Sequence, residues 1–241
     1  MSSRFPLRRA LAALAPLPSL LAALAFAPPA VGATYRAAPD VWHQLVWPVP
    51  AGARTVGELF AGALPARDYG TTWALFGFRA SDQSYAEVAL DATLPEGQAF
   101  WFVQSTGRTV TLDTRDAPFA TGRDSAACDG HAGCSESALG GPAQAEGWNL
   151  VGHPFEAPVN ADALRVATRA TGTGCRRGCA LEASAAMDLV GGRLWRFEPG
   201  SERYVDLAAR RVDPWLGFWV ALRPGGATAR PSLLFPDPFC A

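Results

Sequence analysis

The sequence predicts a mainly β protein with short helices, arranged as two homologous small antiparallel-sheet domains in tandem. Two observations lead to this fold class. The segment 75–102 recurs at 194–220, where the matched positions at a constant spacing of 119 residues are Leu75 and Leu194, Phe76 and Trp195, Phe78 and Phe197, and Tyr85 and Tyr204. Upstream, Trp42 to Pro48 matches Trp148 to Pro154, with Trp and Pro six residues apart in both. Such self-similarity indicates two copies of one unit of roughly a hundred residues.

The chain begins with a segment typical of a secretory signal peptide. Three arginines among the first nine residues precede an almost wholly apolar run over 10–27, and the small residues 31–33 follow it. We expect a signal peptide over 1–33, cleaved near Ala33. Pro16 and Pro18 interrupt the run, whereas a membrane anchor needs about 20 continuous apolar residues. The expected location is therefore periplasmic, cell-surface or extracellular, without a membrane span after cleavage.

The charge balance gives no reason to expect a nucleic acid or anionic lipid as partner. The chain has 21 basic and 22 acidic side chains, and removal of 1–33 takes away three arginines, which leaves a net charge of −4. A weakly acidic protein is not attracted electrostatically to phosphates. The partners that we expect are a cell-surface glycan or another envelope protein. The sequence leaves the oligomeric state open.

The first predicted unit, 34–115, reads as a strand, a helix and an antiparallel meander. Both faces of 42–48 carry apolar groups, which predicts a buried strand. The segment 55–64 has apolar residues at helical spacing, with Thr55 as N-cap and Pro65 as terminator. Four further strands are expected over 73–78, 84–90, 98–104 and 109–113, separated by turn-forming residues.

A linker over 116–146 is predicted from its richness in small and polar residues and its two cysteines. The second unit, 147–236, repeats the pattern with an insertion near 171–180 that contains the sequence CRRGC. Short helices are expected at 160–167, with Asn160 as a possible N-cap, and at 181–190. Residues 237–241 form a C-terminal tail.

The cysteines predict disulfides, because export places the chain where disulfides persist. The simplest pairing joins Cys128 to Cys134 and Cys175 to Cys179, although cross-pairing between linker and insertion stays open. A zinc site with His131 is the less favoured alternative, because the spacing of Cys128 and Cys134 is too wide and no histidine pair supports it. We expect no metal, and the partner of Cys240 stays open.

No catalytic motif is present. The chain has three histidines, His43, His131 and His153, and it contains no G-x-S-x-G, H-E-x-x-H, P-loop or dinucleotide-binding pattern. Carboxylates cluster around both meanders, but on turn-rich sheets they are ordinarily solvated surface residues. We therefore expect no catalytic residues, no cofactor and no enzymatic activity.

Aromatic residues recur at matched positions in both units, and these shared positions are expected to fill the cores. Aromatic residues without a counterpart in the other copy are the better candidates for stacking against a ligand. The residues in this class are Trp47, Tyr69 and Trp215.

At the repeated positions the chain resembles secreted bacterial surface-protein repeat modules, whose copies open with a GWNLVGNP strand and close with a Y…PGQGFWV strand pair. Here the matching pieces are residues 147–154 and Tyr204 with 217–220, and the first copy supplies Tyr85 and 95–101. His153 replaces the usual Asn, and the CRRGC insertion is extra. The resemblance implies an exported, surface-associated protein without an established catalytic role.

The function predicted from these patterns is a non-enzymatic exported structural or binding module of the bacterial cell envelope or surface, for glycans or proteins. The alternative is a secreted hydrolase, with either a glycosidase-like carboxylate pair or His153 and a nearby serine as its site.

Overall fold

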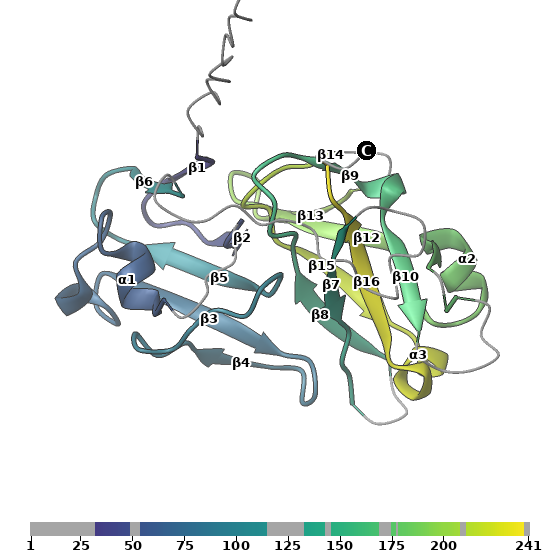
Figure 1. Ribbon diagram of the computed structural model, residues 1–241. Helices are drawn as coiled ribbons and strands as arrows, with labels where there is room; N and C mark the ends of the chain where they lie inside the picture. Colours follow the sequence, from purple (N-terminus) through teal and green to yellow (C-terminus); the bar gives the residue numbers. More distant parts are fainter. Residues whose placement is uncertain are drawn as a thin grey trace, which may run out of the picture. The chain divides into compact units, whose positions relative to one another are not determined.

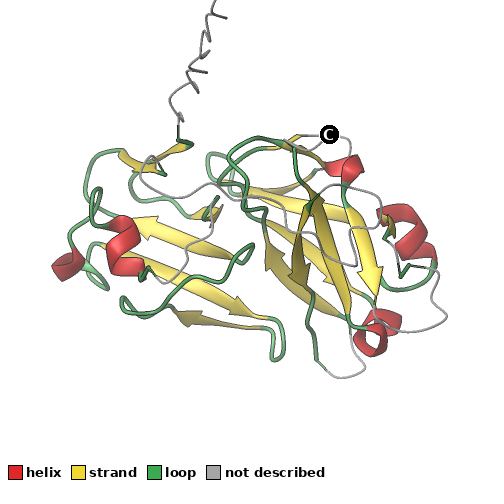
Figure 2. Cartoon of the chain, viewed as in Figure 1, coloured by secondary structure: helices red, strands yellow, loops and turns green. Residues whose placement is uncertain are grey.

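The computed structural model describes residues 32–48, 54–114, 133–142, 146–168, 175–176, 178–207 and 211–238. These residues belong to one compact unit that spans Val31–Ala241 (Figure 1). Small antiparallel sheets and short helices make up their regular structure, which confirms the prediction of a mainly β protein with short helices (Figure 2).

The first half of the chain forms a four-stranded antiparallel sheet, hereafter sheet 1. Its strands in spatial order are β2 (His43–Val46), β5 (Ala99–Gln104), β3 (Trp73–Arg79) and β4 (Ser84–Glu87). All four lie within or overlap segments that the sequence predicts as strands. β4 ends at Glu87, earlier than predicted.

The second half contains another four-stranded sheet, hereafter sheet 2. Its strands in spatial order are β8 (Gly147–Val151), β15 (Phe218–Leu222), β12 (Val190–Glu198) and β13 (Arg203–Asp206). Taken in chain order, the strands of sheets 1 and 2 follow the same path: the first strand lies at an edge beside the last, and the hairpin of the middle two completes the sheet.

The strand registers of the two sheets also agree. Phe78 lies opposite Tyr85 in sheet 1, and Phe197 lies opposite Tyr204 in sheet 2. Likewise Phe76 is paired with Trp101, and Trp195 is paired with Trp219. Since directly opposite residues share a face, these eight aromatic side chains all lie on one face of their sheet.

The remaining strands cover the other faces. β1 (Thr34–Ala37) and β6 (Val110–Asp113) form a ribbon in the first half. In the second half, a third sheet has the order β11 (Cys179–Ala180), β10 (Arg165–Thr168), β16 (Pro231–Pro236) and β7 (Cys134–Ala138), and β9 (Val159–Asn160) pairs with β14 (Arg211–Val212).

Two sequence-based expectations are wrong here. The predicted linker 116–146 contributes strand β7, which pairs with β16 over its whole length. The predicted helix at 160–167 is replaced by the end of β9, a 3₁₀ turn at Ala161–Ala163 and strand β10. The pairing of β10 with β11 and β16 inside the third sheet overrides the helical spacing of its apolar residues. The Asn160 side chain makes no cap hydrogen bond.

The helices are short. α1 (Val56–Phe60) begins at the predicted N-cap: the Thr55 hydroxyl accepts from the Glu58 N–H, and the Glu58 carboxylate accepts from the Thr55 N–H, which is a complete capping box. The helix ends at Phe60, before the predicted Leu64. α2 (Leu181–Ala186) lies within the predicted 181–190, whereas α3 (Pro224–Ala229) was not predicted; a further 3₁₀ turn spans Ala66–Asp68.

Three apolar clusters hold these layers together. One cluster lies between sheet 1, α1 and the β1–β6 ribbon, and a second lies between sheet 2 and the third sheet. A third cluster joins the aromatic faces of sheets 1 and 2, and its buried members are Val46, Phe78, Ala99, Trp101, Leu150 and Trp219. The aromatic residues that were expected to fill two separate cores therefore form, in large part, the layer between two sheets.

Backbone contacts between the halves accompany this layer, and they are reciprocal. The Gly152 N–H, after β8, donates to the Gly97 carbonyl at 2.9 Å, and the Val46 N–H, in β2, donates to the Trp215 carbonyl at 3.0 Å. Gly97 and Trp215 hold the same place in their halves, just before β5 and β15, and both have positive φ, +72° and +71°. In each half, a residue with left-handed backbone conformation thus accepts a hydrogen bond from the end of the other half's first strand or from the residue after it.

The two halves pack closely at Gly152, which allows a test of this packing. A Cβ at Gly152 would lie 2.5 Å from Cγ1 and 2.6 Å from Cβ of Val46. Because Cβ of Val46 cannot move without shifting β2, we expect Gly152→Ala to lower the free energy of unfolding by about 1–3 kcal/mol. Denaturant unfolding measures the change. Gly200→Ala is the matched control, since a Cβ there meets nothing within 4 Å; equal stability of both variants would contradict the proposed close packing.

Candidate functional site

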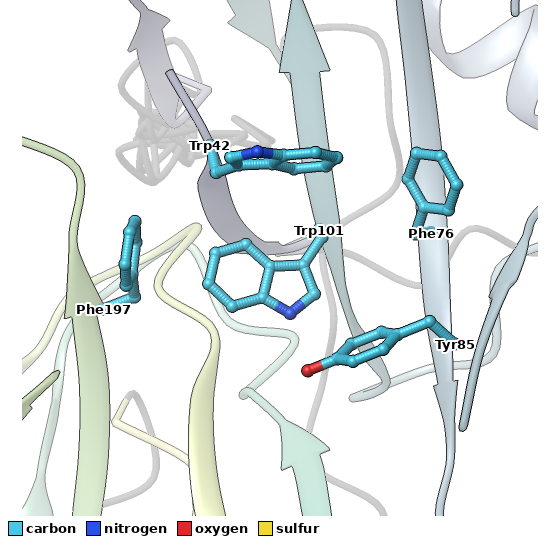
Figure 3. Close-up of a pocket in the computed structure, with 5 residues that line it drawn as sticks. All are labelled: Trp42, Phe76, Tyr85, Trp101 and Phe197. Carbon is cyan, nitrogen blue, oxygen red and sulfur yellow. The ribbon is translucent and has the colours of Figure 1, made fainter. Parts of the chain in front are cut away.

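An aromatic pocket opens in the layer between sheets 1 and 2. Its volume is about 360 Å³, and its lining residues are Trp42, Phe76, Tyr85, Trp101 and Phe197. Four of these come from the first half, while Phe197 comes from β12 of sheet 2. Figure 3 shows the other four rings arranged around that of Trp101. We call this site pocket A.

A second aromatic pocket, pocket B, lies in the same layer. Its volume is about 640 Å³, and its lining residues are Phe78, Gln83, Tyr85, Trp148, Trp195, Tyr204 and Trp219. Four of these seven residues come from the second half, while Phe78, Gln83 and Tyr85 come from the first. Tyr85 lines both pockets, so pockets A and B adjoin one another.

The two pockets are built from equivalent residues. Trp42, Phe76, Tyr85, Trp101 and Phe197 in pocket A correspond in order to Trp148, Trp195, Tyr204, Trp219 and Phe78 in pocket B. The ring contacts repeat as well. Trp101 and Phe197 have centroids 4.9 Å apart at 74°, and Trp219 and Phe78 have centroids 4.7 Å apart at 87°. In both pockets a ring from one sheet packs edge-on against a tryptophan of the other.

The rims of both pockets are exposed to the same degree. Tyr85 and Tyr204 are 52% and 49% exposed, and Trp42 and Trp148 are 45% and 42% exposed. Partial burial raises the pKa of both tyrosine hydroxyls, which therefore stay protonated at neutral pH. These exposed rings lie in two pockets that share Tyr85, and clusters of exposed apolar rings mark binding sites.

The residues predicted to stack on a ligand lie elsewhere. Trp47 and Trp215 are only 4% and 1% exposed and pack edge-on against each other, with centroids 4.7 Å apart. Tyr69 is partly buried against Trp73, and its hydroxyl donates to the carbonyl of Val88. Because these rings fill the apolar cluster of the first half, a stacking platform made of them is not accessible. The absence of a counterpart in the other copy did not distinguish surface from core.

We expect Trp215→Ala to destabilise the fold. Removal of a buried tryptophan side chain costs about 3–5 kcal/mol, and the midpoint of thermal unfolding should fall accordingly. Trp215→Phe is the control, since it keeps the apolar ring and removes an indole N–H that has no hydrogen-bond partner among the described residues. Calorimetry of both variants checks the expected order. A Trp215→Ala variant as stable as the wild type would contradict the buried placement.

His43 and His153 are buried and bonded within the fold. His153 Nε2 lies 3.0 Å from the Val212 carbonyl, and its Nδ1 accepts from the Phe155 N–H at 3.2 Å. His43 bonds to the Ala38 carbonyl and to the Tyr35 hydroxyl. Burial lowers the pKa of both imidazoles, that of His153 to about 4, and raises the pKa of Tyr35 to about 12. Both ring nitrogens of His153 are thus engaged inside the core and bond to no serine.

The depressed pKa of His153 predicts acid sensitivity. In the unfolded chain this imidazole takes up a proton near pH 6.5, whereas in the fold it does so only near pH 4. The unfolded state therefore binds more protons between these values. The contribution of His153 is complete above about pH 6.5 and is lost as the pH falls toward 4, by about 3 kcal/mol in all. Denaturant unfolding at a series of pH values should show a shallower loss in His153→Gln. The same slope in both proteins would contradict the assignment.

The carboxylates of the meanders do not form a pair in either pocket. Glu198 is paired with Arg196 at 2.7 Å, and Asp206 with Arg193 at 3.6 Å. Glu96 accepts a hydrogen bond from Ser135. No group of three or more His, Cys, Asp or Glu in the described ranges is arranged to hold a metal ion.

The disulfide Cys175–Cys179 is present, as predicted, with an S–S distance of 2.07 Å. It closes the insertion loop beside β10 and α2. Cys134 is also disulfide-bonded. Cys128, Cys240 and His131 lie outside the described residues, so the Cys128–Cys134 pairing stays a prediction.

No protein-family model, curated protein or solved structure matches this chain. None of the helices in the described ranges has the length and apolarity needed to cross a bilayer.

Proposed function

We propose that the chain is an exported, non-enzymatic binding module of the bacterial cell envelope, formed by two copies of one sheet unit, and that it binds a glycan across pockets A and B. One observation carries this proposal: the same five aromatic positions line a pocket twice, with four of the five from one half and the fifth from the other, and Tyr85 adds a sixth ring to pocket B. Rings that only filled a core would be buried, whereas four of these rings are about half exposed.

The chemistry of the lining favours a sugar chain. Sugar rings have flat apolar faces that stack on aromatic rings, and their hydroxyl groups lie around the edge. Each pocket has stacking faces within and a tyrosine hydroxyl at its rim. Because the two pockets adjoin at Tyr85, one polymer could place one or more sugar units in each pocket. The mature chain's net charge of −4 gives no support for a polyanion as the ligand.

The alternative, a secreted hydrolase, finds less support. Among the described residues, the lining of the two pockets contains no His, Asp or Glu, and burial raises the pKa of the tyrosine hydroxyls there, so these hydroxyls stay protonated and are weak bases at neutral pH. His153 is enclosed in the core of the second half.

The test is retention on insoluble cell-wall polysaccharide. We expect Trp42→Ala and Trp148→Ala each to weaken retention, and the double variant to abolish it, because each removes a stacking face from one pocket. All three variants should keep the wild-type thermal midpoint within a few degrees, since both indoles are almost half exposed.

Met187→Ala is the matched control, because Met187 is 39% exposed and lines neither pocket. Unchanged retention of the double variant would refute binding at the pockets. Release of reducing sugar by the wild type would instead favour the hydrolase.

A further inference from the structure

The carboxylate of Glu156 has fewer hydrogen-bond partners among the described residues than its two oxygens can accept. Its Oε1 accepts a hydrogen bond from the Thr114 hydroxyl at 2.5 Å and lies 3.5 Å from the backbone nitrogen of Ala33. Its Oε2 is buried and has no hydrogen-bond partner among the described residues. No cationic side chain in those residues pairs with it. Glu156 is half-buried as a whole, but a carboxylate oxygen that is shielded from water and has no partner costs free energy, so the site suits a further hydrogen-bond donor with a positive charge.

Ala33 is held firmly beside this carboxylate. Its carbonyl accepts from both the N–H and the hydroxyl of Thr114, each at 3.2 Å. The next residue, Thr34, opens strand β1, which pairs with β6. The fold therefore holds the backbone nitrogen of Ala33 beside Glu156.

We propose that the signal peptide is cleaved between Gly32 and Ala33, and that the new α-ammonium group of Ala33 binds the carboxylate of Glu156. This inference rests on the proposed export of the chain. Residues Ala30-Val31-Gly32 have small side chains at the positions three and one before this bond, as leader peptidases require. The compact unit begins at Val31, next to it.

The chemistry is an ordinary peptide hydrolysis. A leader peptidase breaks the C–N bond between Gly32 and Ala33; water supplies the oxygen for the new Gly32 carboxylate, and its hydrogen goes to the Ala33 nitrogen. At neutral pH this nitrogen also binds a proton. One amide donor thus becomes an ammonium with three donors and a positive charge, which can bond to both Oε1 and Oε2.

Cleavage one residue later, between Ala33 and Thr34, would leave this site without the Ala33 nitrogen. Removal of Ala33 would take away both of its bonds to Thr114 and the backbone nitrogen that lies beside Glu156. The structure therefore favours the bond after Gly32 over the bond after Ala33.

The chain is unusually suited to a test, because it contains no lysine, so the α-amine is its sole primary amine. Intact mass and N-terminal sequencing of the exported protein should give Ala33 as the first residue. Acetylation with an amine-specific reagent at neutral pH should then be at least tenfold slower in the wild type than in Glu156→Gln. The paired carboxylate raises the pKa of the α-amine above its usual value of about 8.

Glu146→Gln is the matched control, since it removes an exposed carboxylate that pairs with Arg223; it should label like the wild type. Should Glu156→Gln not fold, wild-type protein that starts at Ala33 can be compared with protein that keeps Gly32. The thermal midpoint of the latter should be lower by about 2–4 °C.

The outcomes separate the two proposals. A first residue other than Ala33 overturns the assigned cleavage site, and equal labelling of wild type and Glu156→Gln overturns the ammonium site. An equal midpoint with and without Gly32 also overturns the ammonium site. Protein that stays inside the cell with its whole leader contradicts the export that both proposals share.

Discussion

The structure depends on the packing of two aromatic sheet faces against each other. Trp101 and Trp219 lie at the centre of this layer, and each is met edge-on by a phenylalanine of the opposite sheet. Edge-to-face contacts between large rings are favourable and directional, so they fix how the sheets are placed as well as joining them. The reciprocal backbone bonds at Gly152 and Val46 follow from the same placement.

This packing is isologous in form: the same surface of each half meets its counterpart, as in a two-fold dimer whose subunits are joined in one chain. In such an interface each contact occurs twice, once on each side of the two-fold axis. It therefore accounts for two pockets with equivalent rings, equal exposure of Tyr85 and Tyr204, and equal positive φ at Gly97 and Trp215. Each pocket needs both halves, since Phe197 completes pocket A and Phe78 completes pocket B.

The sequence predicted the strands well because their apolar alternation and turn residues are local signals. Thr55 was recognised as an N-cap for the same reason, and Cys175 and Cys179 are close in sequence. It failed where tertiary contacts decide. Nothing local marks residues 134–138 as a strand, because their structure comes from pairing with β16. The segment 160–167 has helical spacing, yet it joins the third sheet.

The site was missed for a related reason. Alternation shows that Phe76 and Phe78 share a face, but it cannot show that this face meets another sheet rather than a core of its own. The shared aromatic positions were therefore assigned to separate cores, and Trp47 and Trp215 to the surface. A usable signal was present in Trp42 and Trp148, the matched tryptophans directly before β2 and at the start of β8, which are edge strands.

The central claim is that the layer between the sheets is a binding site made twice. Its most direct test is the set of indole N–H signals in the nitrogen–proton spectrum of the mature protein during titration with soluble cell-wall oligosaccharide. The account predicts that the signals of Trp42 and Trp148 shift together, while those of Trp47 and Trp215, buried in the first half, stay in place. Signals of Trp42 and Trp148 that do not move at saturating oligosaccharide would contradict it.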